Sequence, residues 1–101
     1  METWTRAALP LSVYSEMYLS ELANHGRTES TVGTYRDRLR WFGEWIQAVE
    51  ILVRDVTKDT VEQWISDMRA GGLSQKSLRD NVSVVRCFYA WMADRNFLQK
   101  D

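Results

Sequence analysis

Residues 73–97 read LSQKSLRDNVSVVRCFYAWMADRNF and predict one long amphipathic helix. Ser74 follows a pair of glycines and is a suitable N-cap, because its hydroxyl can accept a hydrogen bond from a first-turn N–H. Asn96 can end the helix in a left-handed conformation. The predicted apolar stripe follows the 3.6-residue period of a helix and consists of Leu78, Val82, Val85, Tyr89 and Met92.

The other side of this predicted helix is small, polar and basic. At about 100° per residue, a ridge well away from the apolar stripe carries Lys76, Arg79, Ser83 and Arg86. The helix therefore buries one side and presents another whose size and charge fit a DNA groove. Solvated helix faces also carry such charge imbalances by chance, so the charges alone do not decide between these interpretations.

Two amphipathic segments precede this stretch in the N-terminal half. The first is predicted to be a helix from a Ser12 cap to about Asn24, ended by His25-Gly26, with an inward face of Leu11, Tyr14, Tyr18, Leu19 and Leu22. The second opens at Thr28, with Ser30 as the alternative cap. Its predicted apolar stripe consists of Val32, Tyr35, Leu39, Phe42 and Ile46.

A third helix is predicted over residues 58–70, after a short extended connection at residues 51–56. Thr57 is its expected cap and Gly71-Gly72 its expected end. Its predicted inward face consists of Val61, Trp64, Ile65 and Met68. Four helices of roughly 13, 19, 13 and 20 residues, joined by short links, predict a compact all-α bundle.

Composition favours one small globular domain. The chain has 101 residues, of which 45% are apolar and 12% aromatic, and its formal net charge is −1. No apolar run approaches the ~20 residues of a membrane span, and the N-terminus has no signal-peptide core. We therefore expect a cytoplasmic location and no membrane partner. Cys87 is the single cysteine, has no internal disulfide partner and is expected at a helix edge.

No motif for catalysis or for a bound group is found in the sequence. The single histidine, His25, stands at a predicted helix end and is interpreted as a cap residue, since a zinc site needs about four ligands. Nucleophile–base signatures and a Gly-rich phosphate loop are missing from the sequence. We expect no metal, no cofactor, no small-molecule substrate and no self-contained enzyme.

Three ordered motifs carry a resemblance to a known family. They are TESTVxxYxxxLxxFxxWI at residues 28–46, VTxxxVxxWI at 56–65 and GLSxKSLxxxVxxVRxFYxWM at 72–92. In this order and at this spacing they resemble the N-terminal core-binding (SAM-like) domain of tyrosine recombinases, the phage integrase family. The resemblance covers roughly residues 11–98, with residues 1–10 as an N-terminal tail. It implies an orthogonal four-helix bundle.

The resemblance also implies a function in DNA recombination or integration. In the family this domain forms half of a C-shaped clamp on duplex DNA, and its second and fourth helices approach the major groove of the recombination half-site. A separate catalytic domain follows a linker and carries the Arg, Lys, His and Tyr residues that cut and rejoin strands. That set is not in this sequence, so residues 99–101 are expected to begin the linker and the chain itself to be non-catalytic. Neighbouring recombinase protomers are further expected partners.

By position, the resemblance assigns DNA-binding residues to two helices. Helix two departs from the family pattern at Gly33, and helix four has Ser77 where Thr is more usual. The residues assigned are Thr31, Thr34, Arg36 and Arg40 of helix two, and Ser74, Lys76, Ser77, Arg79, Asp80 and Ser83 of helix four.

Elementary electrostatics fits this assignment. Residues 27–40 and residues 74–86 each carry two more basic than acidic residues, although the whole chain is slightly acidic. Helix N-termini attract phosphate through free N–H groups and the macrodipole. Arginine and lysine contacts to phosphate would set position, whereas Arg79 or Asp80 could contact base edges.

A second hypothesis is a helical protein-interaction module. Trp41 lies about 140° from the apolar stripe of helix two and should be partly exposed unless the N-terminal tail or another chain covers it. Together with Trp45 and Trp4, it could form an aromatic anchor patch for a protein partner. Packing of Trp41 against residues 1–10 is the structural alternative.

Overall fold

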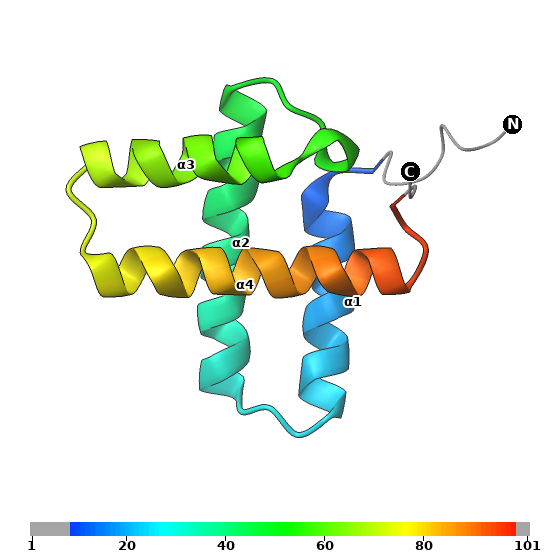
Figure 1. Cartoon of the computed structure of the whole chain (residues 1–101). Helices are drawn as coiled ribbons and strands as arrows, with labels where there is room; N and C mark the ends of the chain where they lie inside the picture. The colour runs from blue at the N-terminus through cyan, green and yellow to red at the C-terminus, as the bar shows by residue number, and fades with distance from the viewer. Residues whose placement is uncertain (1–8, 99–101) are drawn as a thin grey trace, which may run out of the picture.

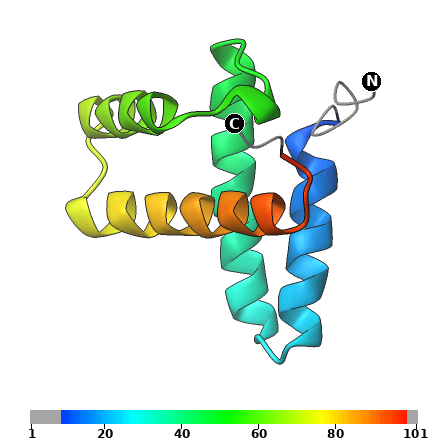
Figure 2. The ribbon, with the colours of Figure 1, turned by 45° about the vertical axis from the view of Figure 1, so that its right-hand side comes forward.

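Four α-helices joined by short turns account for most of residues 9–98, the part of the chain that the computed structural model describes. They are α1 (Leu11–Asn24), α2 (Glu29–Ala48), α3 (Lys58–Ala70) and α4 (Gln75–Asp94). The antiparallel pair α1 and α2 forms one layer, and the pair α3 and α4 crosses it in a second layer (Figures 1 and 2). The predicted all-α orthogonal four-helix bundle is confirmed.

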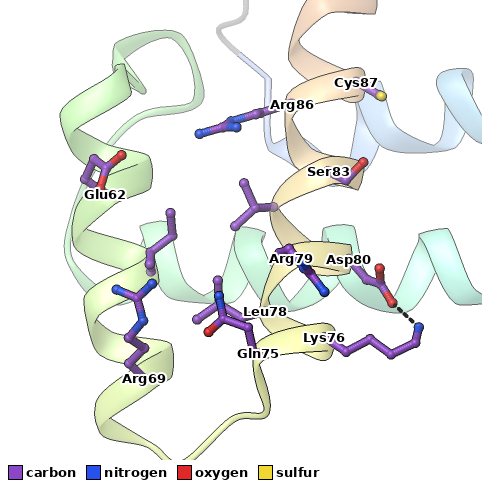
Figure 3. A pocket seen from close by; sticks show the side chains of 12 residues that line it. Glu62, Arg69, Gln75, Lys76, Leu78, Arg79, Asp80, Ser83, Arg86 and Cys87 are labelled. Carbon is purple, nitrogen blue, oxygen red and sulfur yellow. Dashed lines mark hydrogen bonds and ion pairs between the residues drawn. The ribbon is translucent and has the colours of Figure 1, made fainter.

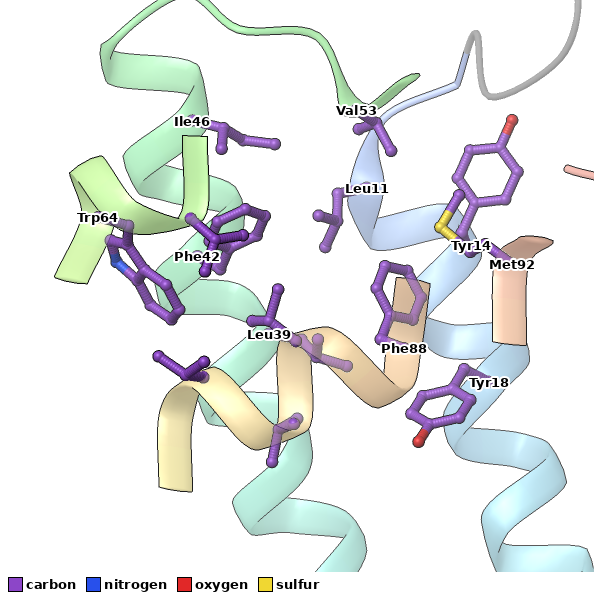
Figure 4. Packing of buried hydrophobic residues seen from close by; sticks show 14 of the residues in the cluster. Leu11, Tyr14, Tyr18, Leu39, Phe42, Ile46, Val53, Trp64, Phe88 and Met92 are labelled. Carbon is purple, nitrogen blue, oxygen red and sulfur yellow. The ribbon is translucent and has the colours of Figure 1, made fainter. Parts of the chain in front are cut away.

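The core lies where α4 crosses α1 and α2 (Figure 4). Aromatic rings join the layers: the ring of Phe88 on α4 lies 5.6 Å from that of Tyr18 on α1. The ring of Phe42 on α2 lies 4.8 Å from that of Trp64 on α3. The largest fully buried side chains are Phe42, Phe88, Leu19, Leu39, Met92 and Val85.

The buried side of α4 is wider than its predicted stripe. Phe88, Val84 and Asn81 are buried although the stripe did not include them. The reason is that α4 contacts three helices, α1, α2 and α3. Three neighbours bury a wider part of the helix surface than the single apolar stripe predicted from the sequence. The stripe residues themselves lie inward, with Tyr89 half-buried and donating its hydroxyl to the carbonyl of Val53 at 2.9 Å.

Three of the four predicted N-caps are confirmed. Thr28, Thr57 and Ser74 each accept a hydrogen bond from the backbone N–H three residues later, so Ser30 is not the cap of α2. The predicted Ser12 cap is wrong. The helix α1 begins at Leu11 after Pro10, because the Pro10 carbonyl already accepts from the N–H of Val13 at 3.0 Å and the Leu11 side chain is drawn into the core.

The connection at residues 51–56 is not simply extended as predicted. It contains a short 3₁₀ helix, η2 (Val53–Asp55), which turns the chain so that Val53 is buried. The expected contacts of Trp4 and of the tail at residues 1–8 lie outside the described residues. Across residues 9–98, no helix is long and apolar enough to cross a membrane.

Each helix ends with one residue in the left-handed conformation, at Gly26, Glu50, Gly72 and Asn96. The pattern is the same each time: the next residue donates its N–H back to a carbonyl in the last turn, as Phe97 does to Met92 at 2.9 Å. The predicted role of Asn96 is thereby confirmed. Glu50, at φ +61°, is the residue of these four whose type is least suited to the left-handed conformation, because the other three are glycine or asparagine.

We expect Glu50→Gly to raise the free energy of unfolding by about 0.5–1 kcal/mol, because glycine removes the strain of the left-handed backbone at the end of α2. Urea unfolding followed by circular dichroism measures the change. Glu44→Gly is the matched control: it replaces the same residue type inside α2 and should destabilise by about 1 kcal/mol. A loss of stability in Glu50→Gly would contradict the role assigned to this turn.

Candidate functional site

The outer face of α4 begins at a capped and exposed helix N-terminus. Ser74 accepts from the N–H of Ser77 at 3.1 Å, and the preceding first-turn N–H groups have no partner within the helix. Lys76, Arg79 and Ser83 are exposed along the next two turns. Of the six α4 residues assigned from the sequence, Ser77 and Asp80 are half-buried and the other four are exposed.

Lys76 and Asp80 form an ion pair on this face. Their Nζ and Oδ2 atoms are 3.0 Å apart, across one turn of the helix. The hydrogen bond from Lys76 lowers the pKa of the Asp80 carboxyl, and the positive charges of Lys76, Arg38 and Arg79 act in the same direction. Asp80 is therefore a carboxylate surrounded by cations, able to accept a hydrogen bond but unfavourable beside a phosphate.

A groove of about 840 Å³ runs between α4 and α3 (Figure 3). Arg79 and Arg86 line it from α4, and Arg69 lines it from the last turn of α3. Glu62 and Asp80 are the carboxylates among its lining residues. The basic ridge predicted for α4 is confirmed as an exposed surface, and it forms one wall of this groove.

On α2, Thr31 and Thr34 lie on the same side of the helix as Arg38. Their hydroxyls bond within the helix: Thr31 accepts from Thr28 at 3.0 Å, and Thr34 donates to the Ser30 carbonyl at 3.0 Å. Arg38, one turn further on, donates to the buried Asn81 side chain of α4. Sequence reasoning missed Arg38 as a site residue, although its spacing from the two threonines puts it on the same side of α2.

Arg36 and Arg40 lie elsewhere. They are about 160° from Arg38 around α2 at 100° per residue, and they line the groove between α1 and α2. Arg36 donates two hydrogen bonds to Glu16 of α1, at 3.0 and 3.1 Å. These bonds raise the pKa of Arg36 and lower that of Glu16. The structure does not bring these two arginines together with the α4 residues.

Arg40 is also close to a carboxylate. Its Nη2 lies 3.6 Å from Asp37 Oδ1, and both side chains are more than half exposed. Surface ion pairs of this kind stabilise weakly, so Arg40 and Arg36 remain able to exchange their partners for another anion.

The tryptophans of the second hypothesis differ in their exposure and contacts. Trp41 is 47% exposed, as predicted. Trp45 is half-buried, stacks on Phe42 at 6.1 Å and donates its indole N–H to Asp67 at 2.9 Å. Trp4 lies outside the described residues. Of the two tryptophans of this hypothesis that the structure describes, Trp41 is the exposed one.

Of the two other reactive side chains described, Cys87 lines the groove and His25 lies away from it. His25 is exposed at the end of α1, with its Nδ1 2.9 Å from the Glu21 carbonyl, and Cys87 is an exposed free thiol on α4. Residues 9–98 contain no group of three or more His, Cys, Asp or Glu placed to hold a metal ion.

The fold and this surface define an all-α, SAM-like domain with one exposed basic helix. The family model described as "Phage integrase, N-terminal SAM-like domain" matches residues 16–96. The chain belongs to this family and is a tyrosine recombinase-related domain, corresponding to the non-catalytic part of integrases. Comparison with curated proteins and with solved structures gave no match.

Proposed function

We propose that this domain binds duplex DNA, holding a recombination half-site for a tyrosine recombinase. The single observation that carries the proposal is the outer face of α4, which combines an exposed helix N-terminus with Lys76, Arg79 and Arg86. Helix N-termini attract phosphate oxygens, and a helix with small and basic side chains fits the ~12 Å width of the major groove. Family membership supports the same function.

The crossing of α2 and α4 supports a two-helix contact. Arg38 and Asn81 mark the crossing, and at 1.5 Å per residue the Thr28 cap lies about 15 Å from it along α2 and the Ser74 cap about 10 Å along α4. The N-termini of α2 and α4 are both exposed. They lie on two crossing helices, each at some distance from the crossing, and are therefore not side by side. A duplex bound to α4 would contact the N-terminus of α2 with the neighbouring part of its phosphate backbone.

Charge pairing ranks the proposed contacts. Arg79 carries no ion pair with another described residue, and Lys76 is paired with Asp80 but remains highly exposed. Arg36 and Arg40 face the α1 side and each have a carboxylate nearby. We therefore propose that Lys76 and Arg79 supply the larger share of the DNA affinity, with Arg36 and Arg40 as outlying phosphate contacts.

We expect Lys76→Ala combined with Arg79→Ala to weaken binding to a fluorescent duplex of about 20 base pairs by roughly 10- to 100-fold, because both cations are lost from the contact surface. Fluorescence anisotropy measures the affinity. Arg36→Ala combined with Arg40→Ala makes the same change in charge and should cost less than about tenfold. Circular dichroism checks that both double variants remain helical. Unchanged affinity in the Lys76/Arg79 variant would overturn the proposal.

Trp41 favours a second candidate, a protein-interaction surface, because nearly half of this large apolar side chain is exposed. An NMR titration with the same duplex separates the two functions. Shifts clustered at residues 28–40 and 74–86 support DNA binding. Shifts nowhere in the spectrum, together with dimerisation that depends on concentration and is lost in Trp41→Ala, support the protein interface.

A further inference from the structure

The groove between α3 and α4 contains three arginines that come from two helices. Arg79 and Arg86 stand two turns apart on α4, about 10 Å along the helix axis. Arg69 lies in the last turn of α3 and lines the groove from the side opposite α4 (Figure 3). The floor between them is apolar, formed by Ile65, Leu78 and Val82.

The charges of this groove are not balanced by its own residues. Within residues 9–98, none of Arg69, Arg79 and Arg86 forms an ion pair. Of the two carboxylates in the lining, Asp80 is already bonded to Lys76, which leaves Glu62 alone against three guanidinium groups. Guanidinium groups that line one groove without paired anions favour a ligand with several negative charges.

The dimensions suit a nucleic-acid strand better than a single small anion. Phosphates follow one another at a rise of about 3.4 Å per nucleotide in one strand of a duplex, so a wall of about 10 Å spans two or three of them. A guanidinium can bond two phosphate oxygens at once, and the wall on the α3 side supplies a donor that α4 cannot provide. The open shape of the groove also admits a continuous chain.

We infer that α3 takes part in DNA binding: Arg69, which lines the groove from the side opposite α4, binds the phosphate backbone that borders the major groove entered by α4. The inference rests on the proposed function and deepens it. The basic surface then extends from α4 onto α3. Both helices, and not α4 alone, contact the backbone of one DNA strand. Arg69 sets position and affinity and does not read base sequence.

Arg69 also interacts with the dipole of α3, and the test must distinguish this structural role from a contact with DNA. A cation in the last turn of α3 interacts favourably with the helix dipole, so its loss could weaken the helix without any role in DNA binding. The dependence of affinity on salt distinguishes the two roles. A lost phosphate contact lowers the slope of log K against log salt by about one, whereas a slightly less stable helix leaves the slope unchanged.

The experiment titrates a fluorescent duplex of about 20 base pairs with the whole chain at several salt concentrations. We expect Arg69→Gln to weaken binding by about 3- to 10-fold and to lower the salt slope by about one. Arg69→Lys, which keeps the charge, should retain most of the slope. Lys58→Gln is the matched control, because it makes the same change in charge on the same helix but does not line this groove.

Two outcomes separate this inference from the proposed function. If Lys76→Ala with Arg79→Ala weakens binding but Arg69→Gln keeps the wild-type slope, the role of α3 is overturned and DNA binding by α4 stands. If the wild-type chain does not bind the duplex, both fail. Should Arg69→Gln not fold, the side-chain Nε–H resonance of Arg69 in the wild-type chain provides the answer. It should shift on addition of duplex, and an unmoved resonance overturns the inference.

Discussion

Phe88→Ala should lower the free energy of unfolding by about 3–5 kcal/mol, the largest single-residue effect expected in this domain. Phe88 is fully buried and sits at the centre of the crossing between α4 and α1. Its ring contacts those of Tyr18 at 5.6 Å and Trp91 at 6.0 Å. Truncation removes the transfer free energy of the ring and leaves a cavity, because two crossed helix pairs cannot close on the space without moving α4.

Urea unfolding followed by circular dichroism at equilibrium measures this loss. Small domains are stable by about 5–15 kcal/mol, so the variant could be partly unfolded without denaturant, and near-ultraviolet circular dichroism would then report the lost aromatic packing. Phe88→Leu is the control, since it keeps an apolar side chain and should cost clearly less. A loss below about 1 kcal/mol in Phe88→Ala would mean that the crossing is not packed around this ring.

Helices and caps were predictable from the sequence because their causes are local. Ser74 and Thr57 accept first-turn hydrogen bonds within three residues, and glycine at Gly26 and Gly72 permits the left-handed turn at little steric cost. The exception is the start of α1, where a proline carbonyl and a buried leucine, rather than a hydroxyl, determine the first turn.

The site was predictable only in part, because its arrangement depends on how the helices cross. The exposed basic face of α4 followed from the periodicity of one helix. The contact between Arg38 and Asn81 did not, since nothing local indicates which flank of α2 meets α4. Arg36 and Arg40 stand six and two positions before Phe42 within the same helix, yet their guanidinium groups lie on the α1 side. The proposed contribution of Arg69 depends on the α3–α4 turn, which brings a residue of α3 into the groove that Arg79 also lines.

Affinity for duplex DNA should depend steeply on salt, with a slope of log K against log salt of about −4 to −5. The proposed contacts neutralise about 4–6 phosphates, and each releases about 0.9 counterion from B-DNA. Between 50 and 200 mM salt the dissociation constant should therefore rise by about 250- to 1000-fold. We expect this dependence despite a net charge of −1, because Arg69, Lys76, Arg79 and Arg86 line one groove whose carboxylates are Glu62 and Asp80.

Anisotropy titrations of the wild-type chain across this salt range measure the slope. The variant with Lys76→Ala and Arg79→Ala provides the internal control, since two lost contacts should reduce the slope by about 1–2 while the helices remain folded. A dissociation constant that changes less than about tenfold over the range would imply at most one or two neutralised phosphates. That result would be incompatible with two helices and an arginine-lined groove holding one duplex, and it would favour the exposed Trp41 surface as the functional one.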